Sequence, residues 1–331
     1  MKHLHYIDVA KGLLILMVAY GHVWYVICHN KGFENPYMGN IHDLVNLWAS
    51  FFMPAFFVIT GYCSNFNKPL SQFFIQQVKS ILIPAFTLAL ISRGLTWLCT
   101  GSGFSLGIVT FLQGGTYWFL MALFVAKLSL YSLLKVSSSI KIIFSCCIAA
   151  YLVTAYINQH LPNFSNLWCW KHAFLLLPSL YLGVVCKNYD ILSKKHFIFV
   201  CWGGYIIMLV SYLLLGYKIP RVTGGIYVPF SQCIQCLFMS SFGAISFLHL
   251  CKTISKSIYL ESIGRNSLVI YCLHEGLIAV LAPLLGKGII QASFREAIIY
   301  YSLVLIFVVS FSHLISTVLN KKYVSFIIGK F

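Results

Sequence analysis

The stretch Tyr6–His22, YIDVAKGLLILMVAYGH, begins an apolar run that continues to about Ile27. A run of this length can cross a bilayer, which requires about 20 residues at about 1.5 Å each. It nevertheless contains Asp8, Lys11 and His22. Because ionisable groups are costly in hydrocarbon, we interpret these three residues as candidates for a functional site.

The spacing of these residues indicates a polar stripe along one helix. A helix turns about 100° per residue, so Lys11 and His22 face within about 20° of one another, about 16 Å apart along the axis. Asp8 precedes Lys11 by three residues, a spacing that allows the two charges to pair. Gly12 and Gly21 are expected to let neighbouring helices approach this stripe closely.

The composition indicates a polytopic membrane protein. The 331 residues are 60% hydrophobic and 9% charged, with a mean hydropathy of +0.85, whereas soluble domains are about 25% charged. We therefore predict an all-α transmembrane bundle formed by a single integral membrane domain, residues 1–331. The first segment is not expected to be a cleaved signal peptide, because its apolar run is too long, it carries two charges and no small-residue cleavage site follows.

About ten apolar segments are long enough to span a membrane. They cover approximately residues 7–28, 44–63, 80–100, 117–134, 140–157, 171–186, 196–216, 228–250, 266–285 and 294–319. Between the second and third segments, residues 68–79 form an amphipathic stretch, with Leu70, Phe73, Phe74 and Val78 on its apolar side. We predict that this stretch is an interfacial helix on the cytoplasmic surface.

The positive charges predict the orientation of these segments. Most Lys and Arg residues fall on the side of the N-terminus: Lys2, Lys68, Lys79, Lys135, Lys141, Lys187, Lys194, Lys195, Lys252, Lys256, Arg265, Lys321, Lys322 and Lys330. Fewer fall on the other side: Lys31, Lys171, Lys218, Arg221, Lys287 and Arg295. This asymmetry predicts that both termini are cytoplasmic. The net charge of +16 does not indicate nucleic-acid binding, because the basic residues form no patch or stripe.

The twelve cysteines do not indicate a disulfide framework or a metal site. Most lie within apolar segments, where cysteine behaves as a small hydrophobe. Cys233 and Cys236 form a CxxC motif inside a predicted span, without a second pair or a histidine at ligand spacing. We expect no metal.

His22 is the strongest candidate for catalysis. It either packs between helices through a hydrogen bond or acts as a general base, because histidine accepts protons from hydroxyls near neutral pH. Asp8 and Lys11 either orient the helix as a charge pair or, in the case of Lys11, meet the phosphates of an anionic cofactor. Further along the chain, His274 and Glu275 lie within one apolar segment and point about 100° apart, so that one can face a pocket while the other packs.

Several motifs resemble those of the acyltransferase 3 family of bacterial integral membrane acyltransferases, close to its fucose-4-O-acetylase-like branch. The resemblance extends over essentially the whole chain, and the first-helix motif is its most specific part. The matching residues are Asp8, Lys11, Gly12 and His22; Phe52, Met53, Pro54, Phe56 and Phe57; Thr60, Gly61 and Tyr62; Lys79 to Pro84; Trp118, Phe119 and Leu120; Leu177, Pro178 and Gly183; and Asn266, Ser267, Leu268, Tyr271 and His274.

The resemblance implies transfer of an acyl group, usually acetyl, from acyl-CoA to a sugar hydroxyl of a cell-surface polysaccharide or lipid-linked glycan precursor, in the bacterial cytoplasmic (inner) membrane. It implies His22 and Asp8 as catalytic residues, and Lys11 and Lys79 as partners of the CoA phosphates. By analogy, His22 activates the acceptor hydroxyl or carries the acyl group transiently. Candidates to contact substrate or the oxyanion are Tyr62, Trp118, His274 and Glu275.

Two departures from the family pattern and two rival functions remain. Many members carry Arg where this chain has Lys11, which supplies charge but no bidentate fork, and Thr60 replaces the usual Ser. Ten helices with few buried charges also fit a transporter or flippase for an anionic or glycolipid substrate, although the paired broken helices of an internal repeat are not apparent. A lipid-modifying acyltransferase would keep the chemistry and change the acceptor.

Overall fold

Most of the described part of the protein is helical, which confirms the predicted fold class. The computed structural model describes residues 4–29, 47–101, 115–254, 256–289, 294–321 and 324–329. The two strands in these ranges, β1 (Arg221–Val222) and β2 (Ile226–Tyr227), form a short antiparallel pair with Arg221 opposite Tyr227.

The chain divides into two compact units, each assembled from separate stretches of sequence. Unit 1 comprises Met1–Asn46, Lys79–Gly107 and Lys256–Phe331, and unit 2 comprises Leu47–Val78 and Ile108–Ser255. The helices of unit 1 are α1 (His5–His29), α5 (Ile83–Thr100), α12 (Ile258–Arg265), α13 (Ser267–Ile289), α14 (Phe294–Leu319) and the 3-10 helix η6 (Ser325–Ile328). The helices of unit 2 are α3 (Phe52–Cys63), α4 (Leu70–Gln77), η2 (Gly115–Tyr117), α7 (Trp118–Val136), α8 (Ile140–His160), η3 (Leu167–Cys169), α9 (Trp170–Asn188), η4 (Ile191–Ser193), α10 (Lys195–Leu214), η5 (Phe230–Gln232) and α11 (Cys233–Ile254).

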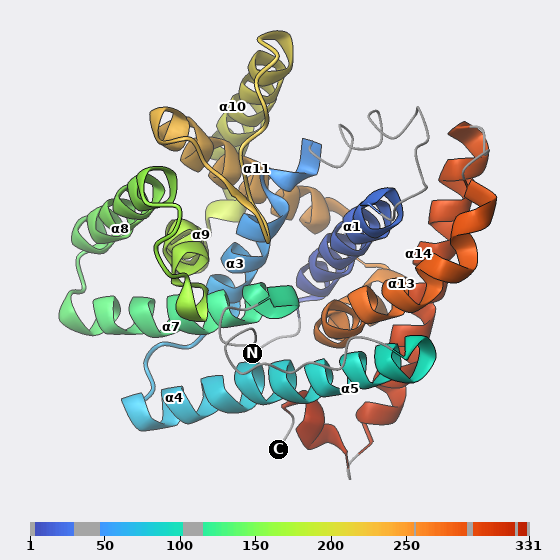
Figure 1. The fold of residues 1–331 in the computed structure, drawn as a ribbon. Coiled ribbons are helices and arrows are strands. Elements are labelled where there is room, and N and C mark those ends of the chain that lie inside the picture. The colour runs from blue at the N-terminus through green and yellow to red at the C-terminus, as the bar shows by residue number, and fades with distance from the viewer. Residues whose placement is uncertain are drawn as a thin grey trace. The chain divides into compact units, whose positions relative to one another are not determined.

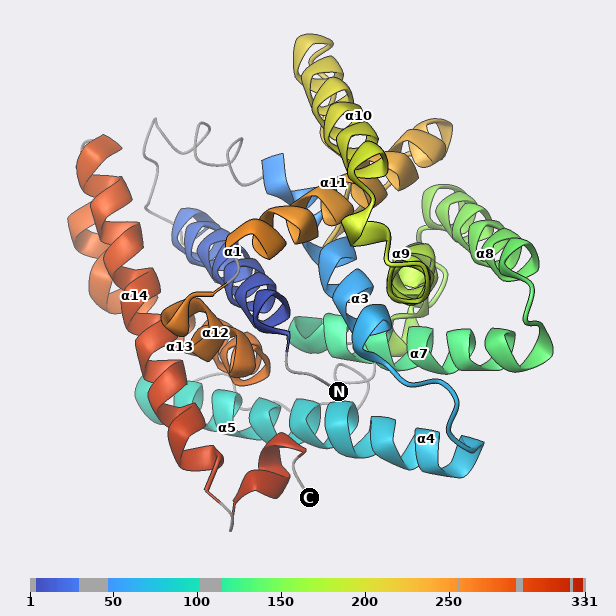
Figure 2. The same ribbon diagram turned by 180° about the vertical axis from the view of Figure 1, so that it is seen from behind.

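Helix α13 lies at the centre of unit 1. It packs against α1, α5 and α14, while the short helix α12 lies along α1 (Figures 1 and 2). The side chains that α13 buries include Val269, Ile270 and Leu273, and α1 buries Leu14 and Ile15. Burial of these apolar side chains holds α1 and α13 in the arrangement that the candidate site requires.

Two glycines bring the backbones of α1 and α12 into direct proximity. A Cβ atom added at Gly12 would collide with the carbonyl oxygen of Leu260, and one added at Gly264 would collide with the carbonyl oxygen of Asp8. Small residues permit such close approach in membrane bundles, where packing drives helix association. The contact at Gly12 confirms that this glycine serves helix packing, as its position beside the polar stripe predicted.

Helix α9 is the centre of unit 2 and packs against α3, α7 and α8 (Figure 1). A reciprocal pair of glycines joins α9 to α3: a Cβ atom at Gly61 would collide with the carbonyl oxygen of Leu180, and one at Gly183 with the carbonyl oxygen of Val58. Pro178 lies inside α9, which membrane helices tolerate because neighbouring groups satisfy the freed carbonyl.

Among the described residues, eight helices are long and apolar enough to span a membrane. They are His5–Val23, Leu70–Thr100, Trp118–Val136, Ile140–His160, Leu167–Asn188, Lys195–Leu214, Phe230–Ile254 and Tyr301–Leu319. Leu47–Cys63 and Ser267–Leu281 are apolar but shorter. Each of these helices overlaps one of the ten predicted segments. The number of spans and the cytoplasmic position of both termini stay predictions. Lys2, Lys31, Lys322 and Lys330 lie outside the described residues.

The boundary of the predicted interfacial stretch differs from the structure. Helix α4, the π-helical turn η1 (Val78–Leu82) and α5 follow one another without a break from Leu70 to Thr100. On α4, Phe73 and Gln77 are buried, whereas Leu70 and Phe74 are exposed. The amide nitrogen of the buried Gln77 donates a hydrogen bond to the backbone oxygen of Phe73, 3.2 Å away, a local pairing that the amphipathic pattern did not indicate.

We expect Gly264→Ala to destabilise the protein by about 1–3 kcal/mol, because the new methyl group would force α12 away from α1. The measurement is the thermal unfolding temperature of the purified protein in detergent. Gly94→Ala on α5 is the matched control, since a Cβ atom there meets nothing within 4 Å. Equal unfolding temperatures for the two variants would contradict the close contact.

Candidate active site

Lys11 and His22 lie within about 20° of one another around the axis of α1. Ile15 and Val18 are on the same face between them, and they are 1% and 2% exposed. The side chains of Lys11 and His22 retain 30% and 34% exposure. The predicted stripe is therefore present at its two ends, while apolar side chains close the face in between.

His22 contacts His274 and Glu275 of α13. Its Nδ1 atom lies 2.8 Å from Nε2 of His274 and 2.8 Å from Oε1 of Glu275. The two imidazole rings are tilted with their centroids 4.7 Å apart. His274 is fully buried, and the side chain of Glu275 is 28% exposed. Both sequence neighbours thus reach the same atom, whereas their directions predicted that one can face a pocket while the other packs.

The backbone of α13 sets the protonation pattern of this cluster. Nδ1 of His274 lies 2.7 Å from the carbonyl oxygen of Tyr271 and 3.1 Å from that of Ile270. Carbonyl oxygens only accept hydrogen bonds, so the proton of neutral His274 resides on Nδ1 and its Nε2 is an acceptor. His22 consequently carries its proton on Nδ1, which is shared between Nε2 of His274 and the carboxylate of Glu275. This tautomer places the lone pair of the His22 ring on Nε2.

The same three residues form the group, within the described ranges, whose spacing could hold a metal ion. Their ligand atoms all lie within 4.8 Å of one another. Two nitrogen ligands of a tetrahedral ion with bonds of about 2.0–2.1 Å would be about 3.3 Å apart. The 2.8 Å between Nδ1 of His22 and Nε2 of His274 is instead a hydrogen-bond distance.

The predicted charge pair at the start of α1 is confirmed. Nζ of Lys11 lies 2.6 Å from Oδ1 of Asp8, whose side chain is 9% exposed. Because Asp8 is buried and acceptor-only when ionised, the lysine compensates its charge. The pair also holds the Lys11 side chain, which is 30% exposed.

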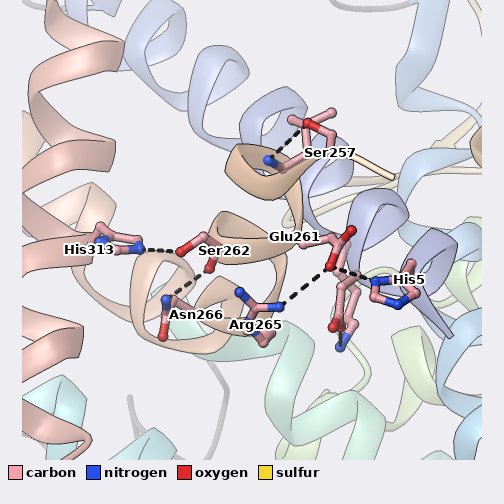
Figure 3. Close-up of polar contacts among 10 residues, drawn as sticks. His5, Ser257, Glu261, Ser262, Arg265, Asn266 and His313 are labelled. Carbon is pink, nitrogen blue, oxygen red and sulfur yellow. Dashed lines mark hydrogen bonds and ion pairs between the residues drawn. The ribbon is translucent and has the colours of Figure 1, made fainter. Parts of the chain in front are cut away.

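Residues of α12 connect this end of α1 to the rest of unit 1. Oε2 of Glu261 lies 2.9 Å from Nδ1 of His5 and 3.6 Å from Nη1 of Arg265 (Figure 3). The hydrogen bond from His5 lowers the pKa of Glu261 below its usual value of 4.5, so the carboxylate is ionised near neutral pH. Ser257 caps the N-terminus of α12, because its hydroxyl accepts a hydrogen bond from the backbone nitrogen of Leu260.

A second set of contacts holds α12 to α14. Oγ of Ser262 lies 2.8 Å from Nε2 of His313, and the amide of Asn266 donates to the carbonyl oxygen of Ser262 at 2.8 Å (Figure 3). The hydroxyl of Ser316 donates to Oδ1 of Asn266 at 2.6 Å. Glu261, Ser262 and His313 were not among the residues predicted from the sequence. His313 and Ser316 are three residues apart and therefore share one face of an apolar helix. This pattern could have indicated that the face meets polar partners inside the protein.

The remaining predicted site residues lie in other places. Lys79 is exposed, in η1. Tyr62, near the end of α3, and Trp118, at the start of α7, belong to unit 2. Trp118 is 6% exposed and its ring lies 4.7 Å from that of His172, centroid to centroid. The structure therefore brings Asp8 to Lys11, and His22 to His274 and Glu275, while roles for Lys79, Tyr62 and Trp118 stay predictions.

Comparison with known proteins gives one finding. No match was found among curated proteins or among solved structures. A family model described as an acyltransferase domain, that of the acyltransferase 3 family, matches residues 4–317, which include parts of both units and the His22 cluster. This chain is accordingly a multi-pass membrane protein of the acyltransferase 3 family.

Proposed function

We propose that this protein transfers an acetyl or other short acyl group from acyl-CoA to a sugar hydroxyl of a cell-surface polysaccharide or lipid-linked glycan precursor, in the bacterial cytoplasmic membrane. The contact of His22 with Glu275 and His274 carries this proposal. A histidine whose Nδ1 donates to a carboxylate, and whose Nε2 carries the lone pair, is arranged as a general base.

In the proposed reaction, Nε2 of His22 accepts the proton of the acceptor hydroxyl as its oxygen attacks the thioester carbonyl. The carboxylate of Glu275, 2.8 Å from Nδ1, stabilises the imidazolium that forms. Collapse of the tetrahedral intermediate breaks the carbon–sulfur bond, and the CoA thiolate receives the proton from Nε2. Transient acylation of His22 itself is the alternative course.

His274 supports the base rather than the oxyanion in this proposal. Both of its nitrogens are engaged, Nδ1 with backbone carbonyls of α13 and Nε2 with His22. We therefore assign it as a positioning residue that holds the tautomer of His22. Tyr62 and Trp118 stay candidates for donors to the oxyanion, which needs preorganised hydrogen bonds.

The acyl donor is proposed to meet Lys11, with Asp8 holding the ammonium in place. Phosphate groups pair readily with such a partly accessible cation, and Lys79, exposed in the same unit, is a second candidate. Because Ile15 and Val18 fill the face between Lys11 and His22, the pantetheine arm must reach Nε2 of His22 beside this face rather than along it.

Family membership favours this proposal over a transporter or flippase, which would use the same buried charges as a conduction path. A lipid-modifying acyltransferase shares the donor and the base, and differs only in the acceptor. Turnover of acyl-CoA separates the first rival from the proposal, and an acceptor panel that includes phospholipids separates the second.

We expect His22→Ala to abolish acyl transfer, with a loss of about 10²–10⁴-fold or more, because general base catalysis contributes about this factor. The assay is release of CoA and label from radiolabelled acetyl-CoA, with and without a glycan acceptor mixture. His196→Ala, an exposed histidine on α10, is the control and should retain activity. Full activity of the His22 variant would refute the assignment, and no turnover by folded wild type with any acyl-CoA would favour a transporter.

Glu275→Gln should lower kcat by about 10²-fold or more and leave KM for acetyl-CoA nearly unchanged, because the carboxylate acts on the imidazolium of the transition state. Glu275→Asp, which keeps the charge, should recover part of the rate. Steady-state kinetics of both variants provide the measurement. Equal losses for Gln and Asp would mean that the residue only packs.

Lys11→Glu should raise KM for acetyl-CoA, because it reverses the charge that faces the donor phosphates. Since this change also places a carboxylate beside Asp8, Lys11→Gln tests loss of charge without repulsion and should show a smaller increase. Acetyl-CoA titrations at low and moderate salt give the two KM values. An unchanged KM in both variants would show that Lys11 only orients α1.

A further inference from the structure

A cleft of about 460 Å³ lies in unit 2, where α10 ends and α11 begins. Its size is within the range of small-molecule sites. It is lined by residues from α10, from the turn that follows it and from the η5–α11 junction: Met208, Ser211, Tyr212, Leu215, Tyr217, Ser231, Gln232 and Gln235. These are aromatic, amide, hydroxyl and aliphatic side chains, and none of them carries a charge.

We propose that this cleft binds a neutral carbohydrate chain. The absence of charge among its described lining residues disfavours phosphate or carboxylate ligands, which recruit Arg and Lys. Sugars present many hydroxyl groups that both donate and accept hydrogen bonds, beside C–H faces that pack on aromatic rings. Paired amides and tyrosines match that chemistry.

The polar groups of the cleft have hydrogen-bonding capacity to spare. The hydroxyl of Tyr212 donates to Oε1 of Gln232 at 3.1 Å, which leaves the amide nitrogen of Gln232 as a donor. Gln235 and Ser231 are exposed, and neither makes a side-chain hydrogen bond with another residue in the described ranges. Each can therefore offer its donors and acceptors to a ligand.

The aromatic wall of the cleft is fixed in place. Tyr212 is 6% exposed and packs with the buried Ile219 and Met239. The chain then turns at Gly216, whose φ is +66°, and the backbone nitrogen of Tyr217 donates to the carbonyl oxygen of Tyr212 at 2.9 Å. This turn places the Tyr217 ring edge-on to Tyr212, with centroids 6.2 Å apart, and leaves Tyr217 52% exposed.

An aromatic platform adjoins the cleft through η5. The Phe230 ring lies 5.5 Å from that of Tyr156 and 6.4 Å from that of His160, centroid to centroid, and all three side chains are exposed. The backbone nitrogen of Phe230 donates to Oε1 of Gln159 at 2.6 Å, which ties η5 to α8. Ser231 follows Phe230 directly and lines the cleft, so one chain could occupy both.

The side-chain amides of Gln232 and Gln235 distinguish this cleft from the aromatic belt at a membrane surface. Such a belt consists of Trp and Tyr rings and does not require amides. Carbohydrate binding in the cleft is proposed independently of the acyl transfer. Only the identification of the bound carbohydrate as the acyl acceptor rests on the proposed function. Binding to the cleft is separable from chemistry, because His22 belongs to unit 1 and the cleft to unit 2.

The test is saturation-transfer NMR on the protein in lipid nanodiscs, with a panel of neutral linear oligosaccharides of three to eight sugars as the probe. We expect transfer to at least one family of these oligosaccharides in wild type, and about tenfold weaker binding in Tyr217→Ala and in Gln235→Ala, since each removes one stacking surface or one amide. Tyr189→Ala, a tyrosine of similar exposure at 49%, should bind as wild type.

Two outcomes would overturn the proposal. One is absence of transfer to every oligosaccharide, or equal transfer in wild type and Tyr217→Ala. The other is transfer to lysophosphatidylethanolamine in place of the sugars, which would make the cleft a lipid site. His22→Ala should retain oligosaccharide binding, so loss of acyl transfer in that variant and loss of binding in the cleft variants report on separate proposals.

Discussion

A polar group inside a membrane-spanning helix has to find its partner within the protein, and this constraint accounts for the arrangement of unit 1. Asp8, His22, His274 and Glu275 would each be costly in hydrocarbon without a partner. The structure pairs them as Asp8 with Lys11 and as His22 with His274 and Glu275. Helix α13 has to lie against α1 for the second set to form, so the same contacts that satisfy these groups also assemble the candidate site.

The backbone takes part in this arrangement as much as the side chains. The carbonyl oxygens of Ile270 and Tyr271 hold the proton of His274 on Nδ1, and this in turn directs the Nδ1 proton of His22 towards α13. In a helix, the side chain of residue i can lie close to the carbonyl oxygens of residues i−3 and i−4, so a ring nitrogen at position i can donate to them. A regular secondary structure thus determines which nitrogen of a distant histidine is available to substrate.

Local spacing predicted some of this from the sequence, and tertiary contacts determined the rest. The helix of Asp8, Lys11 and His22 and the Asp8–Lys11 pair follow from residues within one apolar run. The contact of both His274 and Glu275 with His22 could not be predicted, because it depends on how α1 packs against α13. The short helix α12 was not predicted either, although Ser257 followed by an amphipathic stretch is a helix-start signal.

The closeness of α1 and α12 also has an evolutionary consequence. Along most of an apolar helix, Leu, Ile and Val can replace one another with modest repacking. At Gly12 and Gly264 the facing carbonyl oxygens leave no room for a side chain of any kind. Substitution at either position is therefore blocked unless the two helices separate. Although they are far apart in the chain, both glycines are expected to be retained in any descendant in which Lys11 and His22 keep their roles.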